Sequence, residues 1–198
     1  MAPRRYRLTT RAVSTAATRH RIVKAAAAEY QKRGFRVATL STIAARAGVS
    51  RGSILHHFRD ADGLLRAVLD DMLVTLEVPD ARLLEGAEGA EERARRFVDA
   101  MLRFYDRTSE WWTVFGPEID NPAVQAREAV FWEVIGAFRS AALGSAADDR
   151  VLGAAVDTLT HPATVGLFRS RDVSLDEAIE TFGDLVVNLL RRHGLAGP

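Results

Sequence analysis

Apolar residues recur at spacings of three and four along almost the whole chain, and this period constrains the fold more than any other feature of the sequence. One early helical face carries Ile22, Ala25, Ala26, Glu29 and Tyr30. No segment shows the two-residue alternation of apolar and polar side chains that a half-buried strand requires. The sequence therefore predicts an all-α protein.

Capping residues and helix breakers divide the chain into about nine predicted helices. Gly34 and Gly48 stand where left-handed C-terminal caps are common, and Ser174 with Glu177 forms a capping box. Pro162 interrupts one of the later helices. The predicted ranges are 18–34, 39–47, 51–57, 61–76, 91–107, 109–115, 122–143, 148–168 and 174–193.

Charge is distributed unevenly over a chain whose formal net charge is only +1. Residues 1–60 contain 13 basic and 2 acidic residues, whereas the remainder contains 14 basic and 24 acidic residues. Such a basic segment is typical of proteins that bind a polyanion such as a nucleic acid. We therefore expect the basic N-terminal part and the acidic remainder to have different partners.

Composition excludes several classes of protein. The 198 residues are enough for a buried core in one domain or two small ones, and the absence of cysteine excludes a disulfide framework and a thiolate metal site. No apolar run approaches the roughly 18 residues of a membrane-spanning helix, and the N-terminal residues lack the apolar core of a secretory signal. We expect a cytoplasmic chain without a cofactor, a bound metal or a membrane partner.

Two short predicted helices meet at Gly48. In a helix-turn-helix unit a small residue lets the first helix pack on the second, a glycine makes the turn, and an apolar residue anchors the second helix. Ala44, Gly48 and Ile54 supply these three features in order. A plain helical hairpin within a bundle remains the alternative, because alanine and glycine are common residues.

The sequence around this unit resembles the N-terminal region of the tetracycline-repressor (TetR) family. The resemblance rests on the run Ile-Ala-Ala-Arg-Ala-Gly-Val-Ser-Arg-Gly-Ser-Ile-Leu-His-His-Phe from Ile43 to Phe58, on Leu64 and Leu65, and on the helical apolar residues from Ile22 onward. It covers about residues 18–66, and beyond them only the length and the helical pattern agree.

This resemblance implies a three-helix DNA-binding domain at residues 18–65, preceded by a basic, flexible arm at 1–17 and followed by a ligand-binding and dimerisation domain at 66–198. Members of the family are cytoplasmic homodimers whose binding to operator DNA is usually relieved by a small molecule. The resemblance therefore implies a ligand-responsive regulator, most often a repressor, that binds a pseudo-palindromic operator. A ligand-independent accessory or architectural DNA-binding protein is the alternative.

The expected DNA-contacting residues lie on the two helices of this unit. Arg51 has the fork geometry that binds a guanine edge through two hydrogen bonds. Hydroxyl groups at the start of the first helix suit phosphate contacts. The expected contact residues are Thr39, Ser41, Thr42, Ser50, Arg51, Gly52, Ser53, Leu55, His56 and His57. Ile54 and Phe58 are expected in the core.

Two positions depart from the usual pattern of the family. Leu55 stands where a tyrosine that meets a phosphate is common, and Ala61 stands where a lysine usually opens the next helix. Arginines of the arm, among them Arg4 and Arg11, are expected to compensate by reaching an adjacent groove of the DNA. A solvated tail without DNA contact is the alternative.

Aromatic residues gather in three predicted helices of the acidic part. A pocket of rings with a few polar groups suits a flat or apolar ligand, but helically spaced aromatics also form ordinary packed cores. The residues alone favour the core, whereas the resemblance implies the pocket. The candidate pocket residues are Phe104, Tyr105, Trp111, Trp112, Phe115, Phe131, Trp132 and His161. His161, Glu118 and Arg139 are the candidates for its polar contact.

No catalytic or metal-binding motif is present in the sequence. His56 and His57 are adjacent, so their side chains point about 100° apart on a helix and do not chelate one metal as residues four apart do. An enzyme is therefore not expected.

The last predicted helix has an apolar face too wide for a solvent-facing helix, with Phe182, Leu185 and Leu189 among its residues. Together with the helix before it, this face is expected to form a homodimer interface, as the resemblance implies. Use of the same face in the core of one chain is the alternative.

Overall fold

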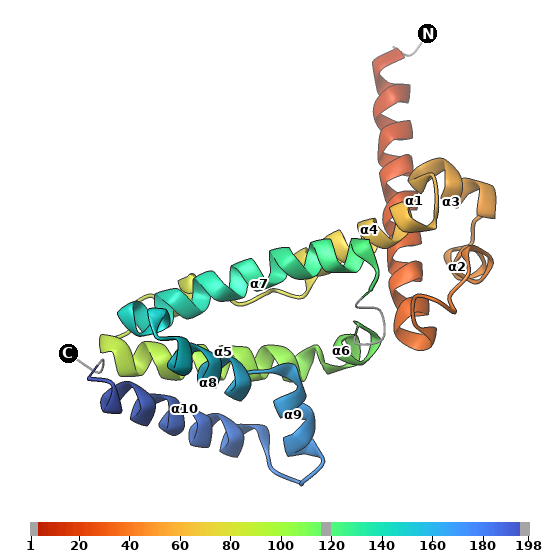
Figure 1. The fold of residues 1–198 in the computed structure, drawn as a ribbon. Helices are drawn as coiled ribbons and strands as arrows, with labels where there is room; N and C mark the ends of the chain where they lie inside the picture. The colour runs from red at the N-terminus through yellow and green to blue at the C-terminus, as the bar shows by residue number, and fades with distance from the viewer. Residues whose placement is uncertain (1–3, 116–119, 195–198) are drawn as a thin grey trace. The chain divides into compact units, whose positions relative to one another are not determined.

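The computed structural model describes residues 4–115 and 120–194, and it describes the side chains of residues 13–114 and 120–194. The chain divides into two compact units. The head comprises Met1–Thr75 and Val114–Arg127, and the body comprises Leu76–Thr113 and Glu128–Pro198. Every regular element in the described ranges is a helix, which confirms the predicted all-α class (Figure 1).

The described residues form ten α-helices and two short 3₁₀ helices. The sequence predicts about nine α-helices. The structure has one more, because Pro162 begins a helix of its own instead of interrupting a longer one. None of these described helices is long and apolar enough to cross a lipid bilayer. The elements are α1 (Arg4–Arg33), α2 (Leu40–Ala47), α3 (Arg51–Phe58), α4 (Ala61–Thr75), η1 (Ala81–Leu84), α5 (Gly89–Arg107), α6 (Ser109–Phe115), α7 (Pro122–Leu143), η3 (Gly144–Asp148), α8 (Arg150–Leu159), α9 (Pro162–Arg169) and α10 (Leu175–Arg192).

Helix α1 begins well before residue 18, where the apolar pattern starts. Its first residue is Arg4, so the backbone of residues 4–17 is helical where a flexible arm is predicted from the sequence. No glycine or proline lies between Pro3 and Gly34, and therefore nothing in this stretch interrupts a helix. Residues 13–17 are all exposed, so burial does not account for this part of α1.

The core of the head forms where α1 packs on α2 and α4, and where α3 packs on the same two helices. Burying a large aliphatic side chain stabilises the folded state by about 1.5–3 kcal/mol relative to leaving it exposed. The side chains buried at these contacts include Ile22, Ile43, Ile54, Leu64 and Val68. The two short helices α2 and α3 are therefore held on a scaffold made by the longer α1 and α4.

Helix α5 is the centre of the body and packs on α9, on α10 and on η1. Helix α10 runs beside α5 and also contacts α8 and α9 (Figure 1). Core residues from α5 and α10 include Phe97, Met101, Leu102, Val186 and Leu190. The apolar face of α10 is thus divided, since Val186 and Leu190 are buried within one chain whereas Leu185 is 43% exposed.

Candidate nucleic-acid interface

The turn between α2 and α3 is built around Gly48. Its φ of 64° and ψ of 39° lie in the left-handed region that residues other than glycine rarely adopt. The N–H of Gly48 donates to the carbonyl of Ala45 at 3.3 Å, and the N–H of Val49 donates to that of Ala44 at 3.1 Å. Helix α2 therefore ends in a compact cap, and α3 can begin three residues later.

Hydroxyl side chains begin both helices of this unit. The N–H of Thr42 donates to Thr39 Oγ1 at 3.2 Å, and Thr42 Oγ1 donates to the carbonyl of Thr39 at 2.9 Å. The N–H of Ser53 donates to Ser50 Oγ at 3.1 Å. These three expected contact residues, Thr39, Thr42 and Ser50, thus cap the helices. The exposed hydroxyl of Ser41 forms no hydrogen bond with the described residues.

Helix α3 turns one face toward solvent and the other toward the core of the head. Ile54 and Phe58 are buried, as predicted. Among the expected contact residues, Arg51, Gly52, Leu55 and His56 are exposed, and Ser53 and His57 are half-buried. Because residues four apart lie on the same side of a helix, the exposed residues form one outward face.

Arginines near this face lack acidic partners. Arg51 and Arg59 are exposed, and neither forms an ion pair with a carboxylate in the described part of the chain. Burial, followed by the nearby His56 and Arg19, lowers the pKa of His57 below its ordinary value of 6.5. His57 is therefore mostly neutral at pH 7, and Arg51 and Arg59 supply positive charge to this face.

The link from α3 to α4 is tight. The N–H of Asp60 donates to the carbonyl of Phe58 at 2.8 Å, across Arg59, which has a φ of 67° and a ψ of −51°. This is a γ-turn with a positive φ at its centre, a strained conformation for a residue with a side chain. Gly63 allows the link, because a Cβ there would lie 2.1 Å from the carbonyl oxygen of Phe58. Backbone geometry, not an ion pair, therefore sets the position of Arg59.

A buried carboxylate, absent from the expected site residues, ties α1 to α2. Glu29 is 5% exposed, and one of its oxygens accepts a hydrogen bond from Arg46 Nε at 2.8 Å. Arg33 Nε lies 3.1 Å from the other oxygen without the geometry of a hydrogen bond. The bond from Arg46, assisted by nearby positive charge, lowers the pKa of Glu29 below its ordinary value of 4.5. Glu29 could have been singled out from the sequence, because it is a lone carboxylate within an apolar helical face.

Two arginines of α1 also hold α2 and α3, and no expectation from the sequence includes them. Arg21 Nε donates to the carbonyl of Ala47 at 3.0 Å, which satisfies a backbone acceptor at the end of α2. Arg19 Cζ lies 4.9 Å from the ring centroid of Phe58, a cation–π contact with the end of α3. No local pattern shows which turn of another helix a long side chain reaches, so sequence alone could not find these contacts.

The pocket candidates in the body form a cluster of aromatic rings in mutual contact. Ring centroids are 5.3 Å apart for Tyr105 and Trp112, and also 5.3 Å apart for Trp112 and Phe131. Phe104 stacks on Phe131 at 5.9 Å. Phe104 and Tyr105 are each 1% exposed, and burial, with a smaller contribution from Asp157, raises the pKa of Tyr105 strongly. These rings pack on one another as a core does.

Other pocket candidates have different surroundings. Trp111 is buried, whereas Trp132 is 39% exposed at the edge of the cluster, with its ring centroid 5.0 Å from that of Phe131. His161 is exposed and caps α9, since its Nδ1 accepts a hydrogen bond from the N–H of Ala163 at 3.2 Å. Five of the aromatic candidates are thus brought together, while the imidazole caps a helix, and the five are Phe104, Tyr105, Trp112, Phe131 and Trp132.

Arg139 is the polar candidate with an unused donor. It pairs with Asp157, the residue that also acts on the pKa of Tyr105, and its buried Nε has no hydrogen-bond partner among the described residues. A buried donor without a partner is costly unless water or a ligand satisfies it. The side chain of Phe115 and the whole of Glu118 lie outside the described residues.

Comparison with known sequences agrees with the geometry of the head. The sequence model of the family described as "Bacterial regulatory proteins, tetR family" matches residues 22–68. The HTH-type transcriptional regulator BetI of Escherichia coli O17:K52:H18 (strain UMN026 / ExPEC) is 36% identical over 118 residues, which cover 58% of this chain and 53% of that protein. The chain therefore spans about half the length of this curated relative.

Solved structures share the fold over most of the chain. The superantigen PfiT matches with a TM-score of 0.70 at 23% identity, covering 85% of this chain and 95% of that one. A putative transcriptional regulator from Pseudomonas aeruginosa PAO1 matches with a TM-score of 0.65 at 19% identity, covering 89% and 91% of the two chains. At these identities the likeness concerns the fold alone.

The family match covers the helix-turn-helix unit itself, since residues 22–68 run from α1 through α2 and α3 into α4. It confirms the resemblance drawn from the run between Ile43 and Phe58. The family consists of regulatory proteins and not of enzymes, as the sequence leads us to expect. Residues 22–68 of the chain are thus similar to the DNA-binding region of the tetR family of bacterial regulatory proteins.

Proposed function

We propose that this protein is a transcriptional regulator that binds double-stranded DNA through α3, in the cytoplasm of a bacterium. The observation that carries the proposal is the exposed face of α3, where Arg51 has no acidic partner among the described residues. The 13 basic residues among the first 60, against 2 acidic ones, make the surroundings of this face attractive to phosphate.

Three exposed residues of α3 suit different features of the DNA major groove. The guanidinium of Arg51 binds a guanine edge through two hydrogen bonds, and Leu55 makes apolar contact with a thymine methyl group. Gly52, without a side chain, lets the backbone approach the DNA closely. The free hydroxyl of Ser41 and the N-terminal N–H groups of α2 suit a phosphate. Contacts to bases and contacts to the DNA backbone thus come from adjacent helices.

Selection of bound sequences from a random DNA pool tests this proposal. We expect a pseudo-palindrome whose half-sites lie about 34–36 Å apart. Arg51→Ala should weaken binding to the selected sequence by about 1–3 kcal/mol and relax the preference at particular base pairs. Arg191→Ala is the matched control, because it removes an arginine of the body that pairs with Glu91. An equal loss of affinity for all sequences in Arg51→Ala would contradict base recognition by this residue.

Such a palindromic site requires two copies of α3, and we propose that α8, α9 and α10 join two chains. Each of these helices exposes a large apolar side chain: Val151 is 75% exposed, Leu167 55% and Leu185 43%. The three helices belong to one packed group, since α10 contacts both α8 and α9. Association that removes these side chains from water would stabilise a homodimer.

Sedimentation velocity tests the dimer. The wild-type protein should sediment as two copies of a 21.8 kDa chain, and Leu185→Glu should shift it toward the monomer. Val134→Glu is the matched control, because Val134 on α7 is 37% exposed and lies outside the three helices. A dimer that persists in Leu185→Glu, or that is lost equally in both variants, would contradict this interface.

A small-molecule effector is proposed to bind beside the ring cluster of the body and to release DNA. The buried, unpaired Nε of Arg139 supports this site, because a polar group of a ligand would satisfy it. We expect a fraction of a metabolite extract to release the selected DNA from the wild-type protein. Arg139→Met should keep DNA binding and lose the release. Arg169→Met, which removes an arginine that pairs with Asp106, should retain both.

The close packing of the rings favours a second candidate, an accessory DNA-binding protein that responds to no ligand. Phe104 contacts both Tyr105 and Phe131, and the packing of the chain itself buries all three rings. A sequence-specific DNA footprint that no fraction of the extract alters would favour this candidate. Release of the DNA that depends on Arg139 would favour the ligand-responsive regulator.

A further inference from the structure

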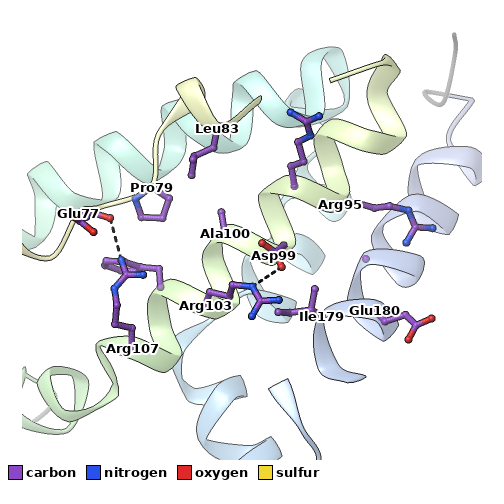
Figure 2. A pocket seen from close by; sticks show the side chains of 13 residues that line it. Glu77, Pro79, Leu83, Arg95, Asp99, Ala100, Arg103, Arg107, Ile179 and Glu180 are labelled. Carbon is purple, nitrogen blue, oxygen red and sulfur yellow. Dashed lines mark hydrogen bonds and ion pairs between the residues drawn. The ribbon is translucent and has the colours of Figure 1, made fainter. Parts of the chain in front are cut away.

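The body carries a groove of about 620 Å³ that shares only Phe104 with the ring cluster proposed above as the effector site. Its walls are the segment from Glu77 to Leu83, helix α5 and helix α10 (Figure 2). This volume falls within the roughly 300–1,000 Å³ of sites that bind small molecules. We propose that the groove binds an amphipathic organic anion, with one negatively charged group and a short apolar body.

Most arginines that line the groove are neutralised by neighbouring acids. Arg95 Nη2 donates to Asp184 Oδ1 at 2.6 Å, and Arg96 pairs with Glu92. Arg103 donates to Asp99 at 2.8 Å and to Asp176 at 2.9 Å. Arg95 and Arg103 thus join α5 to α10, and Arg96 joins two successive turns of α5. The positive charge of all three arginines is balanced by carboxylates.

Arg107 is different. Its Nη2 donates to the carbonyls of Leu76 and Glu77, at 3.1 and 3.4 Å, and no carboxylate of the described residues pairs with it. Neutral carbonyls do not balance a full charge, and Nε and Nη1 remain free to donate. Arg103 lies one helical turn earlier and also keeps an unused Nη1. A carboxylate at this end of the groove would receive charge-assisted hydrogen bonds.

Apolar side chains supply the rest of the groove. Pro79 and Leu83 lie on one wall, Ala100 and Phe104 on α5, and Ile179 on α10. Leu83 is 51% exposed, an unfavourable state for a side chain of its size. An aliphatic or aromatic ligand body would cover it. The groove thus offers apolar contact beside the cationic end at Arg107.

Besides Asp99, which pairs with Arg103, two carboxylates line the groove and limit the ligand to a single charged end. Glu180 on α10 is exposed, and its carboxylate points away from Arg107 (Figure 2). Glu77 is exposed beside the segment that Arg107 holds. A second negative group on the ligand would meet these acids without an unpaired cation nearby. The chemistry therefore favours a monoanion with an apolar tail.

Calorimetric titration of the full-length protein with octanoate tests the proposal. We expect saturable binding of octanoate at one site, and no saturable binding of 1-octanol or octylammonium, which have the same chain without the negative charge. Arg107→Gln should weaken octanoate binding about tenfold, because it removes the unpaired cation. Binding is measured without DNA, so its outcome does not depend on the proposed DNA recognition.

Two further variants locate the binding site. Ala100→Leu fills the floor of the groove without changing its charge, and it should also weaken octanoate binding by about tenfold or more. Arg191→Gln is the control, because it removes an arginine of α10 that does not line the groove. Circular dichroism checks that each variant is folded. Equal binding of octanoate and 1-octanol, or octanoate binding unchanged in both Arg107→Gln and Ala100→Leu, would overturn the proposal.

Discussion

The exposed face of α3 and the seam between α5 and α10 use arginine in opposite ways. Three ion pairs cross the seam, and they are Arg95–Asp184, Arg103–Asp176 and Arg191–Glu91. On α3, Arg51 pairs with no carboxylate of the described residues. The same residue type therefore joins two helices at this seam and stays available to an external anion on α3.

Composition explains this difference. Residues 1–60 provide 2 acidic residues for 13 basic ones, whereas the rest of the chain provides 24 for 14. Exposed ion pairs contribute only about 0–1 kcal/mol each, so the seam gains specificity of packing more than stability. An arginine that remains unpaired beside a recognition helix, or beside a groove as Arg107 does, is therefore a better indicator of a binding site than the number of arginines.

Salt concentration should affect DNA binding by the face of α3 much more than it affects the stability of the seam between α5 and α10. Each phosphate that the head neutralises releases counter-ions, so DNA affinity should fall roughly a thousandfold between about 50 and 200 mM salt if about six phosphates are contacted. The unfolding temperature of the protein without DNA should change little, because its exposed ion pairs are individually weak. Fluorescence anisotropy and circular dichroism measure the two effects. A salt-insensitive DNA complex would contradict the role of the unpaired arginines.

Glu29 allows a test at a place where the head, like the body, uses arginine to join two helices. Its pKa is lowered when folded, so its contribution to the free energy of unfolding is full above about pH 4.5 and is lost as the pH falls through the folded-state pKa. Glu29→Gln should therefore lower the thermal midpoint at pH 7, and the difference from wild type should shrink toward pH 2. The control Glu110→Gln changes an exposed carboxylate of α6. A difference that persists unchanged at low pH would contradict this account.

Substitutions of Arg59 distinguish the effect of its charge on DNA binding from the effect of its backbone conformation on stability. Arg59→Gly relieves the positive φ at the centre of the γ-turn and should raise the free energy of unfolding by about 1 kcal/mol. It also removes an unpaired cation, so DNA affinity should fall and the slope of log K against log salt should become shallower by about 0.9. Arg59→Lys keeps the strain and the charge and should change neither. Unchanged DNA binding in Arg59→Gly would remove Arg59 from the interface.

Features that depend on a few neighbouring residues could be predicted from the sequence. Thr39 caps α2, Gly48 adopts the left-handed conformation, and Ser174 forms a capping box with Glu177, all as their positions indicate. The helix-turn-helix unit is recognisable for the same reason, because its spacing is local. Helix ends and the outward face of α3 therefore follow from short stretches of sequence.

Contacts between distant segments could not be predicted. Glu29 stood out within an apolar face, yet the sequence does not show that Arg46 on the next helix is its partner. The groove has the same origin, because Glu77, Arg107 and Ile179 meet only when the segment before η1, α5 and α10 pack together. Which long side chain remains unpaired depends on this packing, and no local pattern encodes it.

The smallest effect is expected where an arginine is already satisfied. Arg169 of α9 donates from Nε and Nη2 to Asp106 Oδ1, at 3.0 and 2.7 Å, but its side chain is 54% exposed. Because water replaces most of what the carboxylate supplies, Arg169→Gln should lower the free energy of unfolding by less than about 1 kcal/mol in urea denaturation. Its DNA affinity should equal that of the wild type. If Arg169→Gln instead weakened DNA binding as much as Arg51→Ala, paired arginines of the body would also serve DNA, and the distinction between the two surfaces would fail.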